Sequence, residues 1–338
     1  MSQKKMLIIK MASLGDIIQI SPVIDALSEH DDVVIDVLTF EEHRALFQHH
    51  PKIRQVIGLR RSVFSILKTT IRIIFNRYDI GFNFHRSTLL DALMFFCRIK
   101  CRFGFSSPEK TSLFLNESVS FDLNKSRHQR YLSIVKSALG GAIDASSYGL
   151  SYYKSPGAVC ALPVTDAPYI VIAPYGGENR YSSMVSRVWG GYPELIQQIL
   201  QDVSTHHVIL TGGPSDEDNL LKLKNSFDDR VHVFVGNYDE LALLLESAVC
   251  FIGNDSFPLF MAIASKCKAL AIFGPTDARL IVEPYKNTYF IQSDVDCSPC
   301  YNPLEGIRNI AYNCPYDIKC MTSISIQKVF NKLKDICF

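Results

Sequence analysis

The 338-residue sequence contains no apolar run approaching the roughly 20 residues that a membrane-spanning helix needs. It also lacks a charge excess, because 35 lysines and arginines stand against 34 acidic residues, and a neutral chain is a poor partner for nucleic acid. Only four apolar residues separate the basic amino terminus from Lys10, too short a core for a signal peptide. Abundant Ile, Leu, Val and Phe exclude intrinsic disorder. We therefore expect a cytoplasmic globular protein without a nucleic-acid partner.

Apolar segments alternate with helix-period segments on both sides of a looser stretch at 152–168. We expect strands at 6–11, 33–40, 79–84, 169–174, 207–211, 231–235, 249–253 and 269–273. Helices are expected at about 62–75, 88–98, 192–202, 217–227 and 239–247, and from 258. This alternation predicts an α/β protein with two Rossmann-like, doubly wound domains facing a central cleft. We place the domains at 1–158 and 159–338, the second with a Cys-rich segment at 297–320 and a terminal helix.

The first candidate site follows the first predicted strand, in the segment Ser13-Leu-Gly15-Asp16. Gly15 permits a tight turn or a close approach of another backbone. Asp16 has two interpretations: it caps the next helix, or it is a general base that projects from a strand end. Ligands of such sheets bind beyond the carboxyl ends of the strands, which is where this segment lies.

His85 and Arg86 follow the strand predicted at 79–84 in the same domain. This corner could face an acceptor substrate, and the guanidinium of Arg86 would suit an anionic group on it. A helix cap formed by Ser87 explains the same corner equally well.

The second domain carries glycines, hydroxyls and charged residues after its own strands. Two glycines after the strand at 169–174, with an arginine further on, are typical of an anion-binding loop. A helix predicted to begin near Pro258 would offer its amino-terminal amides to phosphate, or simply be capped by the residues before it. The candidate residues of this domain are Ser182, Ser183, Arg187, Glu217, Asp255, Ser256 and Phe257.

Taken together, these motifs resemble glycosyltransferase family nine, the ADP-heptose:lipopolysaccharide heptosyltransferases, which have the GT-B fold. The segment at 9–27, Ile-Lys-Met-Ala-Ser-Leu-Gly-Asp-Ile-Ile-Gln-Ile-Ser-Pro-Val-Ile-Asp-Ala-Leu, is similar to the opening signature of the family. Segments 210–217, 253–256 and 273–277 are similar to its carboxy-terminal signatures. The resemblance runs from Leu7 to about Lys334.

The resemblance implies a GT-B-like enzyme that transfers heptose from ADP-heptose, with inversion, to a cell-envelope glycolipid or another glycan or protein acceptor. It implies that Asp16 is the general base and that no catalytic metal is required. Ser13, Gly15, His85 and Arg86 would lie on the acceptor side. By resemblance, Arg187 stands where the family has a phosphate-binding lysine, Ser182 and Ser183 near donor-contacting hydroxyls, Glu217 near the ribose, and Asp255 and Ser256 before the diphosphate-binding helix.

The sequence departs from the family at the start of this helix. Phe257 stands where the family has glycine, and Phe260 where it has histidine. Three alternatives therefore stay open: a transferase for another nucleotide sugar such as a UDP-hexosamine, a non-catalytic sugar-nucleotide-binding protein, and an epimerase. The epimerase is the weakest, because it needs more acid/base residues than the sequence offers.

Four of the ten cysteines lie close together in the sequence, at Cys297, Cys300, Cys314 and Cys320. A CxxC pair followed by two more thiols predicts a structural zinc or iron site. Some members of the family have a comparable cysteine tail. Reduced structural thiols, or a disulfide in an oxidising compartment, are the alternative.

The helix predicted at 62–75 combines apolar and basic residues. Most such helices pack on a sheet, but a basic rim beside aromatic residues also suits anionic lipid headgroups. The sequence therefore also predicts peripheral contact with the inner face of the cytoplasmic membrane.

Overall fold

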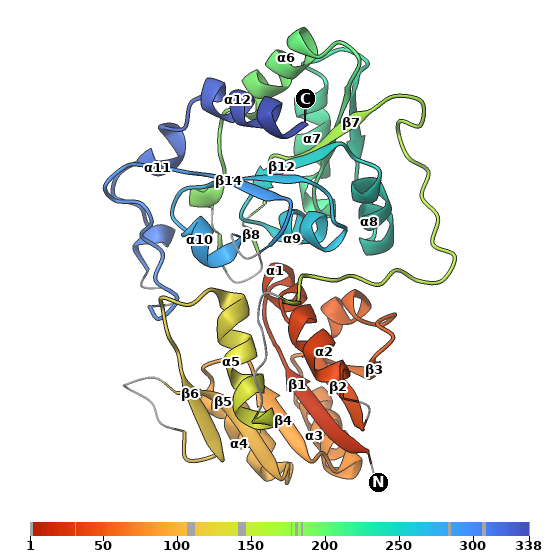
Figure 1. Ribbon diagram of the computed structural model, residues 1–338, viewed down its shortest axis with the longest axis vertical. Coiled ribbons are helices and arrows are strands. Elements are labelled where there is room, and N and C mark those ends of the chain that lie inside the picture. The colour runs from red at the N-terminus through yellow and green to blue at the C-terminus, as the bar shows by residue number, and fades with distance from the viewer. Residues whose placement is uncertain are drawn as a thin grey trace. The chain divides into compact units, whose positions relative to one another are not determined.

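The structure is a computed structural model that describes residues 3–30, 32–106, 112–140, 147–176, 178–179, 182–183, 185–282, 285–305 and 309–337. The chain divides into two compact units, Met1–Pro156 and Gly157–Phe338. Each unit contains one six-stranded parallel sheet with helices on its faces (Figure 1). No helix of the described ranges is long and apolar enough to cross a membrane.

The sheet of the first unit has the strand order β3-β2-β1-β4-β5-β6. Its strands are β1 (Lys4–Ile9), β2 (Val33–Phe40), β3 (Ile53–Leu59), β4 (Ile80–Asn83), β5 (Cys101–Ser106) and β6 (Glu117–Ser120). Its helices are α1 (Leu14–Ile18), α2 (Ser21–Ser28), α3 (Val63–Asn76), α4 (Thr88–Phe96) and α5 (Arg127–Leu139), with a 3-10 helix at Glu41–Leu46. In Figure 1, α2 and α5 lie in front of the sheet and α3 and α4 lie behind it.

The second unit repeats this topology with the order β11-β10-β7-β12-β13-β14. Its strands are β7 (Tyr169–Ala173), β10 (His207–Thr211), β11 (Val231–Phe234), β12 (Cys250–Asn254), β13 (Ala269–Phe273) and β14 (Thr288–Gln292), with a hairpin of β8 (Glu178–Asn179) and β9 (Ser182–Ser183). Its α-helices are α6 (Tyr192–Asp202), α7 (Glu217–Lys224), α8 (Tyr238–Glu246), α9 (Phe257–Ala264), α10 (Ala278–Ile281), α11 (Lys319–Thr322) and α12 (Ile326–Cys337). Short 3-10 helices lie at Val185–Arg187, Pro214–Asp216 and Ile310–Tyr312.

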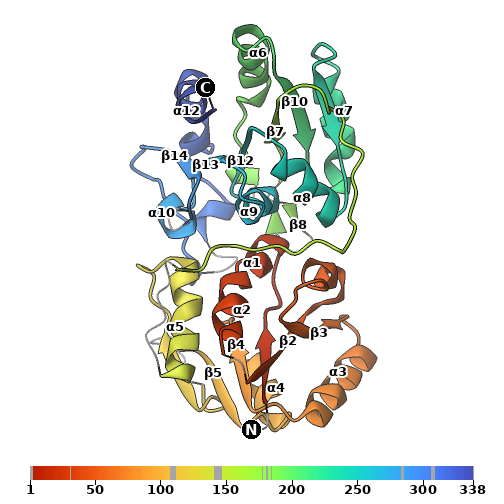
Figure 2. The ribbon, with the colours of Figure 1, turned by 45° about the vertical axis from the view of Figure 1, so that its right-hand side comes forward.

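The central strands are apolar along most of their length because helices cover both faces of each sheet. β1 pairs in parallel with β2 and β4, and β7 pairs in parallel with β10 and β12. In the core of the second unit, α6 and α12 pack against β7, β10 and β12, and Figure 2 shows these elements together. The predicted fold class, two Rossmann-like doubly wound units, is confirmed.

This topology fixes where a ligand would bind in each unit. The strand order reverses between β1 and β4 in the first sheet and between β7 and β12 in the second. Open α/β sheets bind ligands outside the carboxyl ends of the strands at such a switch point. The topology therefore favours ligand binding at the segments after β1, β4, β7 and β12.

Candidate functional site

Asp16 lies after β1, at the switch point of the first sheet. Ser13 occupies the amino-cap position of α1 and donates from Oγ to Asp16 Oδ2 at 3.0 Å. The interpretation of Asp16 as the helix cap is therefore wrong, because the carboxylate stands three residues inside the cap. Arg127 of α5 forms an ion pair with the other carboxylate oxygen. Asp16 is thus held by two partners while about a third of its side chain, 32%, stays exposed.

Gly15 lies between these residues in the first turn of α1. Its carbonyl accepts a hydrogen bond from Gln19 Nε2 at 2.7 Å, one turn further along the chain. The short loop between β1 and α1 thus holds its shape through local hydrogen bonds, and it presents Asp16 at the edge of the sheet.

His85 ties the loop after β4 to the end of β1. The Met11 backbone N–H donates to the His85 ring at Nε2 (2.7 Å), and the backbone N–H of His85 donates to Asn83 Oδ1 at 3.0 Å. Burial, and then the nearby charge of Lys10, lower the pKa of His85 from 6.5 to about 3, although Asp16 acts in the opposite direction. The ring is therefore neutral, and its proton lies on Nδ1 because Nε2 accepts.

This depressed pKa predicts a pH dependence of stability. Between about pH 6.5 and pH 3 the unfolded chain protonates this imidazole and the folded chain does not, so stability falls as the pH falls through that window. The contribution approaches about 1.4 kcal/mol per pH unit. We expect His85→Gln to flatten the dependence of the unfolding midpoint on pH between 6.5 and 4. The same substitution at exposed His30 should leave the slope unchanged; equal slopes for all three proteins would contradict the expectation.

A buried lysine lies behind these groups. Lys10 is only 5% exposed, and its Nζ donates to the Tyr131 hydroxyl at 2.7 Å and to the Phe84 carbonyl at 3.2 Å. The same Nζ lies 4.8 Å from the centroid of the Tyr131 ring. Sequence reasoning missed this residue, although a lysine at the end of an otherwise apolar strand was a usable signal.

Two further cations lie on one aromatic ring beside this corner. The guanidinium carbons of Arg86 and Arg130 lie 4.9 Å and 4.5 Å from the centroid of Phe121. Ser87 accepts from the Leu90 backbone N–H and caps α4, so the capping interpretation of Ser87 is confirmed. The carboxyl edge of the first sheet therefore carries four cations, Lys10, Arg86, Arg127 and Arg130, of which Arg127 contacts Asp16.

In the second unit, buried Asn254 joins the segments that surround the switch point. Its Oδ1 accepts from the Trp189 backbone N–H at 3.1 Å and from the Tyr192 hydroxyl at 3.0 Å, and its Nδ2 donates to the Pro174 carbonyl at 3.2 Å. Trp189 is buried in the core, where its Nε1 donates to the Ile324 carbonyl. Its role is therefore structural. The ends of β7 and β12 are thereby fixed relative to each other.

Arg187 and Asp255 form an ion pair at this edge. Arg187 Nη1 lies 3.2 Å from Asp255 Oδ2 and also donates to the Asp255 carbonyl at 3.4 Å. The guanidinium lies 5.4 Å from the ring centroid of Tyr301. Asp255 is almost fully buried, so this carboxylate depends on the arginine for compensation of its charge.

Three buried polar atoms near these residues have no hydrogen-bond partner among the described residues: Arg187 Nε, Ser256 Oγ and Thr276 Oγ1. Ser256 occupies the amino-cap position of α9, but its hydroxyl makes no capping hydrogen bond. A Cβ on Gly176 (φ +112°) would lie 3.0 Å from Ser256 Cβ, so only glycine allows this close approach. Donors without partners at a helix amino terminus suit an anion. Thr276, after β13, is a residue that the sequence analysis did not select.

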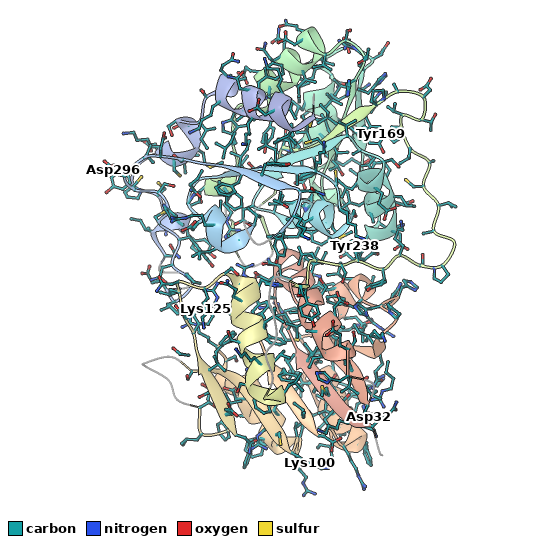
Figure 3. The ribbon with its side chains drawn as sticks, viewed as in Figure 1. Asp32, Lys100, Lys125, Tyr169, Tyr238 and Asp296 are labelled. Carbon is teal, nitrogen blue, oxygen red and sulfur yellow. The ribbon has the colours of Figure 1, made fainter. Side chains whose placement is uncertain are left out.

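The structure gives less support to the other residues that were predicted to bind the donor. Phe257 turns towards α8, where its ring centroid lies 5.4 Å from that of Tyr238, a residue labelled in Figure 3. Phe260 is buried in the core. Glu217 is exposed at the first residue of α7. Ser182 and Ser183 form β9, and their side chains lie outside the described residues.

The four cysteines at 297–320 lie near one another beside β13. Burial, followed by the charges of the other three thiols, raises the pKa of Cys320 to about 11, and burial with two neighbouring thiols raises that of Cys300. A Cβ on Gly274 would lie 2.9 Å from Cys320 Sγ. However, the described residues contain no group of three or more His, Cys, Asp or Glu side chains arranged to hold a metal ion. The structure therefore does not show the predicted metal site, but it places the four thiols near one another.

Comparison with known proteins identifies the family. The model of glycosyltransferase family 9 (heptosyltransferase) matches residues 67–308, more than two thirds of the chain. The chain belongs to glycosyltransferase family 9. The family resemblance expected from the motifs is confirmed, and the protein is a glycosyltransferase.

Individual relatives agree with this membership. Lipopolysaccharide heptosyltransferase 3 of Escherichia coli K12 is 25% identical over 294 residues, which cover 78% of this chain and 80% of that protein. The structure of the E. coli ADP-heptose lipopolysaccharide heptosyltransferase II matches with a TM-score of 0.72 at 17% identity, over 98% of each chain. The iron-containing dodecameric glycosyltransferase TibC of enterotoxigenic E. coli matches with a TM-score of 0.62 at 14% identity, over 99% of this chain and 76% of its own. Both structures share the GT-B-like fold with this chain.

Proposed function

We propose that this glycosyltransferase transfers heptose from ADP-heptose to an anionic glycan of the cell envelope, with inversion at the anomeric carbon. The observation that carries the proposal is the position of Asp16, a partly exposed carboxylate at the switch point of the first sheet, oriented by Ser13 and Arg127. The names of the relatives, a lipopolysaccharide heptosyltransferase and an ADP-heptose heptosyltransferase, support the donor and the acceptor class.

In the proposed reaction Asp16 accepts the proton of the acceptor hydroxyl as its oxygen attacks the anomeric carbon. The bond from that carbon to the phosphate oxygen breaks, and ADP leaves with the electron pair. Arg187, the Ser256 hydroxyl and the first amide of α9 are the groups that would stabilise the charge on the leaving diphosphate. These groups carry positive charge or donate hydrogen bonds, so we assign the stabilisation of the leaving diphosphate to them.

The acceptor proposal rests on the cations of the first unit. Lys10, Arg86, Arg127 and Arg130 all lie at the carboxyl edge of the first sheet, where Arg127 pairs with Asp16. A carboxylate or phosphate on the acceptor would be attracted to these cations, and arginine suits such groups because its donors form a fixed fork.

Donor choice is the direct test of the proposal. We expect ADP-heptose, and not UDP-N-acetylglucosamine, to raise the melting temperature and to be consumed in the presence of a heptose-accepting core glycan. Binding at a concentration of 100 times Kd stabilises the native state by about 2.7 kcal/mol, which a thermal-shift assay detects. A melting temperature that rises only with UDP-sugars would assign a different donor.

Phe257 favours one rival, a protein that binds a sugar nucleotide without transferring the sugar. If its ring blocks the diphosphate, Phe257→Gly should create transferase activity that the wild type lacks. Our proposal expects the wild type to be active, because Phe257 packs on Tyr238 of α8. Wild-type binding of ADP-heptose without turnover, together with turnover by Phe257→Gly, would establish the rival.

A structural metal at Cys297, Cys300, Cys314 and Cys320 is a second part of the proposal. Its supports are the mutual proximity of the thiols and the iron named for TibC. The metal would fasten the segment 297–320 beside Gly274 and take no part in transfer. We expect about one zinc or iron per chain after anaerobic purification, because a four-thiolate site is tetrahedral and closed.

Removal of one ligand tests the metal without relying on activity. Cys314→Ser should release the metal and lower the melting temperature, while Cys160→Ser, outside the cluster, should change neither. Wild-type protein without stoichiometric metal would leave these residues as reduced thiols, the alternative that the sequence already offered.

A further inference from the structure

Helix α3 carries large apolar side chains on the face that points away from the sheet. Its buried residues are Thr69 and Ile73, one turn apart, and they mark the side that faces the sheet. The opposite side of a surface helix is normally polar. In α3 that side carries Phe64, Leu67, Ile71 and Phe75. Phe64 and Phe75 are 77% and 80% exposed, so the described part of the unit leaves this stripe uncovered.

The apolar surface continues onto α4, the neighbouring helix on the same side of the sheet. Cys97 Sγ, at the end of α4, lies 3.9 Å from the Thr70 carbonyl of α3, so the two helices lie side by side. Leu89, Phe95 and Phe96 are exposed on α4. The rings of Phe95 and Phe96 also pack on Phe114, at centroid distances of 5.6 Å and 6.2 Å. We call these residues of α3 and α4, with Phe114, the α3–α4 surface.

Positive charge borders the α3–α4 surface. From residue 60 to residue 77 the sequence contains five cations and no acidic residue: Arg60, Arg61, Lys68, Arg72 and Arg77. Arg98 lies just after α4, and Lys100 follows at the amino end of β5, where Figure 3 shows it pointing away from the sheet. Lys100 pairs with Asp79, but within the described ranges no ion pair joins Lys68, Arg77 or Arg98 to a carboxylate. A partner of negative charge is therefore favoured.

We propose that the α3–α4 surface docks the protein on an anionic lipid bilayer. An exposed apolar stripe flanked by lysine and arginine is the pattern of helices that lie in a membrane interface, where the apolar side chains enter the acyl boundary and the cations contact headgroups. The stripe runs the length of α3 and extends over a second helix, which suits a broad surface such as a bilayer.

The α3–α4 surface begins at the same edge of the sheet as Asp16, so docking would bring the site to the bilayer. α3 begins four residues after β3 ends and α4 begins five residues after β4 ends, so both helices start at the carboxyl edge that carries Asp16 and Arg86. A bilayer against Phe64 and Leu89 would hold this edge close to the headgroups. A lipid-linked acceptor would then reach the site without leaving the membrane.

Vesicle cosedimentation tests the proposal with the full chain. We expect binding to vesicles of 30 mol% phosphatidylglycerol in phosphatidylcholine, weaker binding in 0.5 M salt, and little binding to phosphatidylcholine alone. Affinity should fall about fivefold for each lysine or arginine that no longer meets an anionic headgroup. The double substitution Phe64→Ser and Phe75→Ser should lower vesicle affinity about tenfold or more. Neither residue packs in the core, so the melting temperature should stay unchanged.

The matched control is Val159→Ser with Leu221→Ser, which removes two exposed apolar side chains from the second unit. This variant should bind vesicles as the wild type does. Equal binding by all three proteins, or no preference for anionic lipid, would overturn the proposal. So would a dimer in sedimentation velocity that only the Phe64/Phe75 variant fails to form, since the surface would then join two copies of the chain. The assay contains no donor, so its outcome is independent of transferase activity.

Discussion

Substitution of Asp16 by asparagine is expected to lower kcat by about 10²- to 10⁴-fold, the contribution of a general base. The amide keeps the shape of the side chain: its oxygen can still accept from Arg127, and its NH2 group can donate to the Ser13 hydroxyl oxygen. It cannot accept a proton, so the acceptor hydroxyl must attack without assistance. The KM for ADP-heptose should change little, because the donor is proposed to bind the other unit. Release of ADP in the presence of acceptor gives the rate.

The matched control for this substitution is Asp79→Asn. Asp79 also forms an ion pair, with Lys100, but it lies beside the amino end of β4, at the opposite edge of the same sheet. This variant should retain kcat. Asp16 would not be the base if Asp16→Asn turned over within about threefold of the wild type while folding normally.

Substitution of Arg187 by methionine is expected to have two large effects. Removal of a charged group that stabilises the leaving diphosphate should lower kcat/KM for the donor by about 10²- to 10³-fold. The same change leaves the carboxylate of Asp255 buried and uncompensated, which costs about 3–5 kcal/mol of stability. Steady-state kinetics and denaturant unfolding measure the two effects separately.

Two further variants separate the catalytic effect from the structural one. Arg187→Met combined with Asp255→Asn removes the buried charge as well, so stability should largely return while activity should not. Arg187→Lys keeps the positive charge and should retain more activity than methionine does, with some decrease because lysine cannot reproduce the guanidinium fork. If the double variant regained full activity, the role of Arg187 would be purely structural.

The parts of the fold that the sequence predicted well are the central apolar strands and the helices between them. Strands at 33–40, 207–211 and 269–273 and the helix at 192–202 have the bounds that were predicted. These segments are buried on both faces or carry a clear apolar stripe, so the local pattern contains the information. The local pattern did not predict β3, β5, β6 and β14, which lie at or next to a sheet edge, where polar residues interrupt the apolar pattern.

The missed helix α5 had the largest consequence for the site. Its first turn is polar, Arg-His-Gln-Arg, and it follows a segment without a strong apolar signal. Arg127, Arg130 and Tyr131 all lie on this helix. The partner of Asp16, one of the two arginines that flank Phe121, and the hydroxyl that holds Lys10 were therefore invisible to motif reasoning.

Without any structure, the sequence determined the fold class and the family, and it made Asp16 the candidate for the base, because strand and helix periods and the order of short motifs are local properties of the chain. Only the tertiary structure decided the partners: Arg127 on Asp16 from 111 residues away, Arg187 on Asp255 from 68, and Lys10 on Tyr131 from 121. It also decided which side of α3 faces the sheet, and therefore that the apolar stripe of this helix is exposed. Such contacts depend on which strand ends the parallel topology brings to one edge, and no local pattern encodes that.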